Sequence, residues 1–186
     1  MNSGNHIMTG AVPGIRVGSG TRRAARISAF ILFAAIGAQL AVRLPWTPVP
    51  VTMQTLFVVL AGIVLGPRDG FYAMVGYLAL GAAGAPVFAG FSFGPLALVG
   101  PTGGYLLAFP VAALVSGSIS VKSGKTLSGI FTGVFCGSAL ILFSGTLYLI
   151  AMTGMSVRTA MALGVTPFIA GDIFKVVAAT VIARKR

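Results

Sequence analysis

Two charged residues, Asp172 and Lys175, lie in the middle of the last hydrophobic stretch of the chain, residues 163–183. The whole sequence has only two acidic residues, and Lys175 is its only cation inside an apolar segment. A spacing of three places both side chains on one face of a helix. Each charge at the middle of a bilayer costs about 2.5–3.5 kcal/mol on insertion scales. The pair therefore indicates either an internal ion pair or a site for a ligand that has N–H donors and a negative charge.

Polar or aromatic residues near the same ends of neighbouring apolar segments could complete such a site. They are Thr52, Gln54, Phe88, Tyr105 and Trp46. Gln54 is the strongest candidate, because an amide in an apolar segment needs hydrogen-bond partners. A hydrogen bond between two helices would satisfy it equally well. No His, Glu or Cys accompanies Asp172, so the pattern predicts no catalytic residue, no metal site and no cofactor, and not an enzyme.

The elements that carry these residues are membrane helices. The chain of 186 residues is 56% hydrophobic and 8% charged, with a mean hydropathy of +0.99. This composition predicts an integral membrane protein of the all-α class, and 26 glycines and 10 prolines are compatible with membrane helices. The net charge of +11 does not indicate nucleic-acid binding, because the basic residues flank the hydrophobic runs, where topology signals belong.

Hydropathy and the Gly, Pro and charge breaks predict six membrane-spanning helices. The expected spans are 27–42, 52–66, 70–85, 103–121, 127–152 and 163–183. With both termini in the cytoplasm, ten of the 13 Lys and Arg residues fall on the inner side. Two, Arg43 and Arg158, fall outside, and Lys175 lies in the membrane. This distribution predicts a cell-membrane protein with its N- and C-termini inside.

The parts between the spans are also informative. Residues 1–24 are rich in Gly, Ser and Arg and are expected to form a disordered cytoplasmic tail before a transmembrane domain at 25–186. The connection 43–52 holds three prolines and is stiff. The connection 86–102 is uncharged and aromatic, which favours a cap folded over an outer pocket. A loop lying on the lipid interface is the alternative. Asp69, the second acid, is expected to be the N-cap of the third helix.

Small residues recur with a spacing of four in the first span. Ala25 and Ala29 form one such pair, and Ala34 and Ala38 form another. Small residues at this spacing let a second helix approach closely. The second helix could belong to the same bundle or to a partner protein.

Four ordered motifs give the chain a resemblance to a known family. They are PVPVTMQT at 48–55, GAPVFAG at 84–90, GPTGGYLLAFP at 100–110 and GDIFK at 171–175. Together they resemble BioY, the biotin-binding S component of energy-coupling-factor (ECF) vitamin transporters. The resemblance implies a six-helix fold, a biotin pocket near the extracellular face and vitamin uptake in prokaryotes. It implies that Asp172 and Lys175 bind the ligand.

The resemblance also implies partners. The small-residue face of the first helix would meet a transmembrane coupling subunit, which works with two ATPases. The residues alone leave open whether the chain transports without this module, self-associates or acts as a proton-coupled carrier. A single membrane acid makes a poor proton relay, and this weighs against the last possibility.

Overall fold

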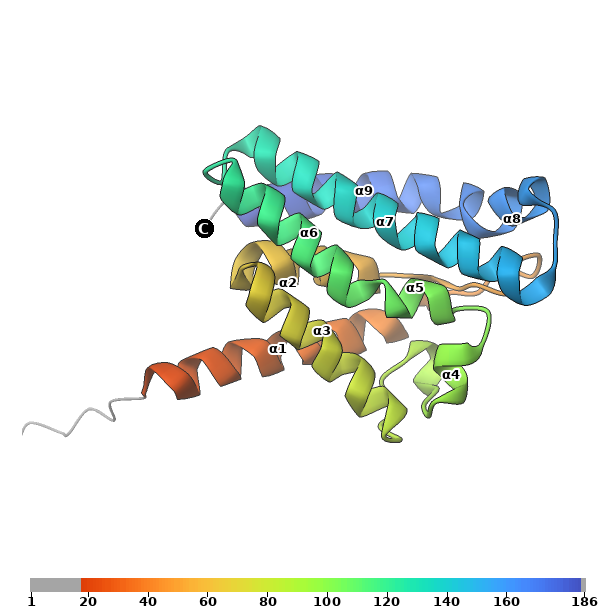
Figure 1. Ribbon diagram of the computed structural model, residues 1–186, viewed down its shortest axis with the longest axis horizontal. Coiled ribbons are helices and arrows are strands. Elements are labelled where there is room, and N and C mark those ends of the chain that lie inside the picture. Colours follow the sequence, from red (N-terminus) through yellow and green to blue (C-terminus); the bar gives the residue numbers. More distant parts are fainter. Residues whose placement is uncertain (1–17, 185–186) are drawn as a thin grey trace, which may run out of the picture.

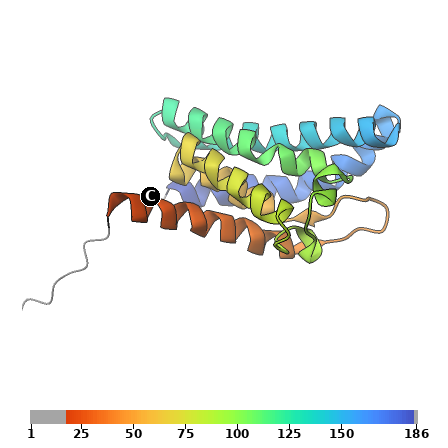
Figure 2. The ribbon, with the colours of Figure 1, turned by 60° about the horizontal axis from the view of Figure 1, so that its bottom comes forward.

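The structure, a computed structural model, describes residues 18–184 and is almost entirely helical. Long helical elements lie side by side along the length of the molecule (Figures 1 and 2). They are α1 (Ser19–Gln39), α2 (Gln54–Leu65), α3 (Pro67–Ala82), the consecutive pair α5 (Gly103–Leu107) and α6 (Phe109–Lys122), α7 (Leu127–Thr153) and α9 (Thr166–Arg184). This arrangement confirms the predicted all-α class.

Short elements join the long ones at one end of the bundle. They are the hairpin strands β1 (Ala41–Val42) and β2 (Val51–Thr52), the 3-10 turn η1 (Ala89–Phe91), α4 (Leu96–Val99) and α8 (Val157–Gly164). The strands pair antiparallel, with Ala41 opposite Thr52. The hairpin, α4 and α8 lie at the right-hand end in Figure 1.

The opposite end of the bundle holds the basic residues. The start of α1, the α2–α3 and α6–α7 connections and the end of α9 all lie there (Figure 1). Their exposed cations are Arg22, Arg23, Arg26, Arg68, Lys122, Lys125 and Arg184. Arg43 and Arg158 belong to elements of the other end. The fold therefore segregates charge along its long axis, as a positive-inside membrane protein does.

Among the described residues, three helical stretches are both long and apolar enough to cross a bilayer. They are Gly103–Lys122, Leu127–Thr153 and Thr166–Arg184. The helix α1 is of similar length but begins with three arginines, and α2 and α3 have 12 and 16 residues. A multi-pass membrane protein is supported, while the count of six spans stays a prediction.

Glycines allow the central helices to pack with their backbones in contact. A β-carbon on Gly62 of α2 would lie 1.9 Å from the carbonyl oxygen of Ala113 in α6. A β-carbon on Gly117 would lie 2.4 Å from the carbonyl oxygen of Gly62. Only a residue without a side chain fits at such distances, and close approach of this kind holds membrane helices together.

Several predicted boundaries are wrong, and backbone chemistry explains most of them. The helix α1 begins at Ser19, so residues 19–24 are helical although they were predicted as tail; residues 1–17 lie outside the described part. The fourth span is broken at Ala108, because Pro110 has no N–H to donate within the helix. The sixth span begins at Thr166, after the separate helix α8.

Asp69 does not have its predicted role. The N-cap of α3 is Gly66, at φ 92°, and Asp69 lies in the first helical turn. There its carboxylate accepts hydrogen bonds from Arg23 of α1, with 2.6 Å between Oδ1 and Nη2. A negative charge in the first turn is also favoured by the helix dipole. The pair thus fastens α1 to α3 at the basic end.

The small residues of α1 divide into two groups. Ala34 and Ala38 are completely buried inside the bundle, so their assignment to a partner interface is wrong. Their spacing serves packing within the chain, which the sequence had left as the other possibility. Ala25 is exposed and Ala29 is half-buried, so this part of the face remains accessible.

Candidate functional site

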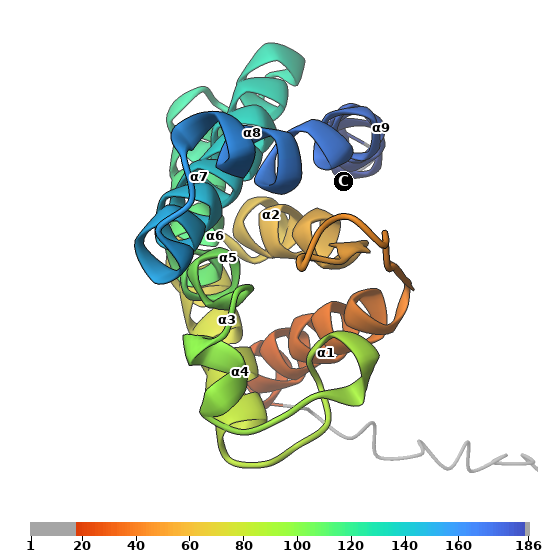
Figure 3. The same cartoon turned by 90° about the vertical axis from the view of Figure 1, so that its right-hand side faces the viewer.

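A cavity of about 510 Å³ opens between the helices near the hairpin end of the molecule. This size is typical of a site for a small organic ligand. Figure 3 shows the hairpin connection and the outer loop at this end, above and beside α2. The lining includes all six residues proposed from the sequence: Thr52, Gln54, Phe88, Tyr105, Asp172 and Lys175. Helices far apart in the chain therefore bring these residues together.

The charged pair lies buried in the wall of the cavity. Asp172 is 8% exposed and Lys175 is 4% exposed. The Nζ atom of Lys175 donates to Oδ1 of Asp172 at 2.9 Å and to Oγ1 of Thr55 at 3.0 Å. An ammonium has three N–H donors, so the third is available to a ligand acceptor. Asp172 uses Oδ1 for this ion pair, and its other oxygen can accept from a ligand donor.

Gln54 faces the cavity and also joins two helices. Its Nε2 donates to the hydroxyl of Tyr77 in α3, and that hydroxyl donates to the carbonyl of Val87 at 2.8 Å. Both sequence interpretations of Gln54, the pocket residue and the helix–helix hydrogen bond, therefore describe the same side chain. Thr52 adds a weak hydrogen bond to Oε1 of Gln54, at 3.3 Å.

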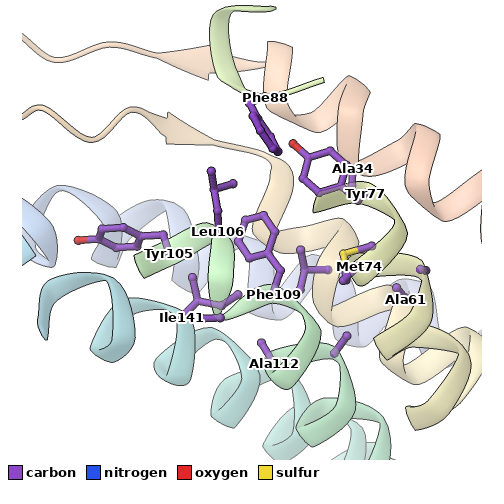
Figure 4. Packing of buried hydrophobic residues seen from close by; sticks show 14 of the residues in the cluster. Ala34, Ala61, Met74, Tyr77, Phe88, Tyr105, Leu106, Phe109, Ala112 and Ile141 are labelled. Atoms are coloured by element: carbon purple, nitrogen blue, oxygen red, sulfur yellow. The ribbon is translucent and has the colours of Figure 1, made fainter. Parts of the chain in front are cut away.

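Aromatic side chains form much of the remaining wall (Figure 4). The ring of Phe88 is 1% exposed and packs edge-on against Tyr77. Tyr105 stacks on Phe168 with 6.0 Å between ring centroids. The Tyr105 hydroxyl donates to the carbonyl of Gly164 at 2.9 Å, so its ring is the part left for a ligand. Such a wall suits a flat apolar body.

Two connecting segments line the outer part of the cavity. The outer loop contributes Phe88 and Ser92, and the hairpin connection contributes residues 43, 44 and 47–50. The hairpin is tied to the far side by Thr47, whose hydroxyl donates to the carbonyl of Leu163 at 2.8 Å. These contacts agree with the expected cap. The alternative also holds for part of the loop, because Phe91 and Phe93 are 65% and 60% exposed.

The exposed residue Arg43 marks the mouth of the cavity. A β-carbon on Gly90 would lie 1.9 Å from its Nη2 atom, so the guanidinium rests on the backbone of the outer loop. Arg43 therefore bridges the two segments that surround the opening. Trp46, a candidate from the sequence, is 62% exposed and is not among the lining residues.

Sequence reasoning missed several lining residues. Arg43 was counted only as a topology signal, and Thr55 was quoted in a motif without a role. The apolar wall residues Phe109, Ile141 and Phe168 carry no signal that separates them from lipid-facing neighbours. A polar residue beside Gln54 in an apolar helix was the one available signal, and it points to Thr55.

Comparisons with known proteins agree on one family. The family model described as "BioY family" matches residues 7–186. A protein of Pyrococcus horikoshii named probable biotin transporter BioY is 41% identical over 86% of this chain and 92% of its own length. The biotin transporter BioY of Thermotoga maritima is 36% identical over 87% and 94%.

A solved structure leads to the same place. The crystal structure of the S component for biotin from an ECF-type ABC transporter superposes with a TM-score of 0.84. It is 25% identical in sequence, and the match covers 91% of this chain and 93% of that one. With the family model matching nearly the whole chain, this protein belongs to the BioY family.

Proposed function

We propose that this protein is the membrane-embedded subunit that binds biotin with high affinity and mediates its uptake. The observation that carries the proposal is the buried Asp172–Lys175 pair in the wall of an otherwise largely aromatic and apolar cavity. Biotin has a ureido group with two N–H donors and a carbonyl, an apolar bicyclic body and a carboxylate tail. Each of these three parts has a chemical counterpart in the cavity.

In the proposed pose the ureido group meets the buried pair. The free oxygen of Asp172 accepts a ureido N–H, and the third donor of Lys175 binds the ureido carbonyl. The aromatic wall around Tyr105 covers the bicyclic body. The carboxylate then extends toward the mouth, where the guanidinium of Arg43 can pair with it.

Titration of purified protein with biotin and with biotinamide, which lacks the negative charge, tests this pose. Biotin should bind saturably, and Arg43→Gln should weaken it by about two- to fivefold, because an exposed ion pair contributes little. The same variant should leave the affinity for biotinamide unchanged. Arg158→Gln, which removes the other cation of this end, is the matched control. Equal losses for both ligands in Arg43→Gln would place the carboxylate elsewhere.

We further propose that uptake is energised by an ECF module of a coupling transmembrane subunit and ATPase subunits. The chain would then span a prokaryotic cell membrane six times, with both termini in the cytoplasm. The clustering of exposed cations at one end of the bundle supports this orientation. The accessible face at Ala25 and Ala29, close to that end, is the proposed contact for the coupling subunit.

Co-expression with a coupling subunit and its ATPases tests the partnership. The wild-type chain should co-purify with them, and a bulky residue in Ala25→Leu should reduce recovery of the complex without changing biotin affinity. Leu32→Phe, at an exposed position of the same helix, serves as the control. Saturable biotin uptake by the chain alone, unaffected by the module, would favour the solitary carrier instead. Uptake that follows the proton gradient would favour a proton-coupled carrier.

A further inference from the structure

The outer loop is held from outside the cavity by the side chain of Gln39, the last residue of α1. Its Nε2 donates to the carbonyl of Phe88 at 3.1 Å, and its Oε1 accepts from the N–H of Phe91 at 3.0 Å. One amide group thus bonds to both sides of the turn. Phe88 and Ser92 of this loop line the cavity, whereas Gln39 does not.

The turn that Gln39 holds has an unfavourable backbone conformation. Gly90 and Phe91 lie at φ 67° and φ 58°, in the left-handed region. Glycine adopts this conformation freely, but the β-carbon of phenylalanine disfavours it. The ring of Phe91 is 65% exposed, so burial of the ring does not hold the residue in place. The bond from its N–H to Gln39 is therefore suited to stabilise the turn.

A second hydrogen bond fixes the start of the same loop, but it is connected to the cavity. The hydroxyl of Tyr77 donates to the carbonyl of Val87 and accepts from Gln54, a lining residue. A change at Tyr77 would therefore disturb the wall and the loop together. A change at Gln39 alters the support of the loop and leaves every lining side chain in place.

We propose that Gln39 is a positioning residue that keeps the outer loop against the cavity and thereby slows the release of bound biotin. The inference rests on the proposed function, in which the cavity is the biotin site. Release requires the mouth to open, so weaker support of the loop should act mainly on the dissociation rate. Because Gln39 ends α1, it also connects this loop to the first helix.

Dissociation and association rates of biotin, measured on purified variants, test the role of Gln39. Gln39→Leu removes both hydrogen bonds at nearly constant volume and should raise the dissociation rate about tenfold, with less than about a threefold change in association. Gln39→Glu keeps the acceptor for Phe91 and loses the donor to Phe88, so its effect should be intermediate. Ile36→Ala, an exposed change one turn earlier in α1, should leave both rates unchanged.

Two further readouts separate positioning from a general loss of stability. Hydrogen exchange of the segment 87–93 in ligand-free protein should rise in Gln39→Leu, while exchange in α7 should not. Phe91→Asn should also slow biotin release in the Gln39→Leu background, because asparagine tolerates the left-handed conformation better. If Gln39→Leu does not fold, Gln39→Glu with and without Phe91→Asn carries the same test.

The outcomes are distinguishable from those for the proposed function. Wild-type release rates in both Gln39 variants, or faster release with unchanged exchange of the loop, would overturn the inference. So would a failure of Phe91→Asn to slow release. If the wild-type protein binds no biotin, the proposed function fails, and loop exchange in the ligand-free variants still decides whether Gln39 supports the loop.

Discussion

Neutralising either member of the buried pair, with Asp172→Asn or Lys175→Met, is expected to abolish high-affinity biotin binding while the protein still inserts into the membrane. Each change removes a group proposed to bind the ureido moiety and leaves the opposite charge buried without its partner. Breaking a buried ion pair in this way costs about 3–5 kcal/mol. In affinity this corresponds to a loss of about two to four orders of magnitude.

Calorimetric titration of purified, monodisperse protein is the measurement for this prediction. Insertion should be unaffected or improved, because each variant carries one charge fewer in the membrane. Asp69→Asn is the matched control, since it neutralises the only other acid, at the basic end and in the pair with Arg23. It should bind biotin as the wild type does. Wild-type affinity in both Asp172→Asn and Lys175→Met would remove the pair from the binding site.

Gly62→Ala is expected to cause the largest loss of stability from a single methyl group. The new β-carbon would lie 1.9 Å from the carbonyl oxygen of Ala113 and 2.8 Å from its carbonyl carbon. Both atoms belong to the backbone of α6, so no rotation of a side chain can relieve the contact. The helices α2 and α6 must move apart, and overpacking of this kind costs about 1–3 kcal/mol or more.

Thermal unfolding in detergent, followed by far-ultraviolet circular dichroism, measures this effect as a fall in the midpoint temperature. Biotin binding should weaken as well, because α2 also carries Gln54 and Thr55 of the cavity wall. Gly171→Ala is the control for a Gly-to-Ala change in a helix. Its β-carbon would meet only Cγ1 of Val51 at 3.8 Å, so its midpoint should not fall. An unchanged midpoint in Gly62→Ala would contradict the close packing of α2 on α6.

Much of the site could be predicted from the sequence, because its key residues are chemically conspicuous. Asp172, Lys175 and Gln54 are costly in an apolar segment, and that cost is visible without a structure. The ordered motifs led to the same family that the comparisons show. Trp46 was wrongly included, because an aromatic residue in a loop can face lipid as readily as a cavity.

Other features were beyond prediction because they depend on the faces that packed helices turn toward each other. The spacing of Ala25, Ala29, Ala34 and Ala38 is compatible with any neighbouring helix, and the fold buries only the last two. The role of Arg43 depends on a hairpin that brings it over Gly90. Gln39 looked like an ordinary helix terminus until the loop at 88–91 was seen to fold against it.

The sequence by itself determined the membrane class, the helical fold and the presence of one charged pair on one helical face. Hydropathy and a spacing of three act within a single segment, so they can be evaluated one segment at a time. Only the tertiary structure decided that Thr55 meets Lys175, 120 positions away, and that Gln39 holds the outer loop. Such contacts join distant segments, and they exist only once the close approach of the helices has placed those segments side by side.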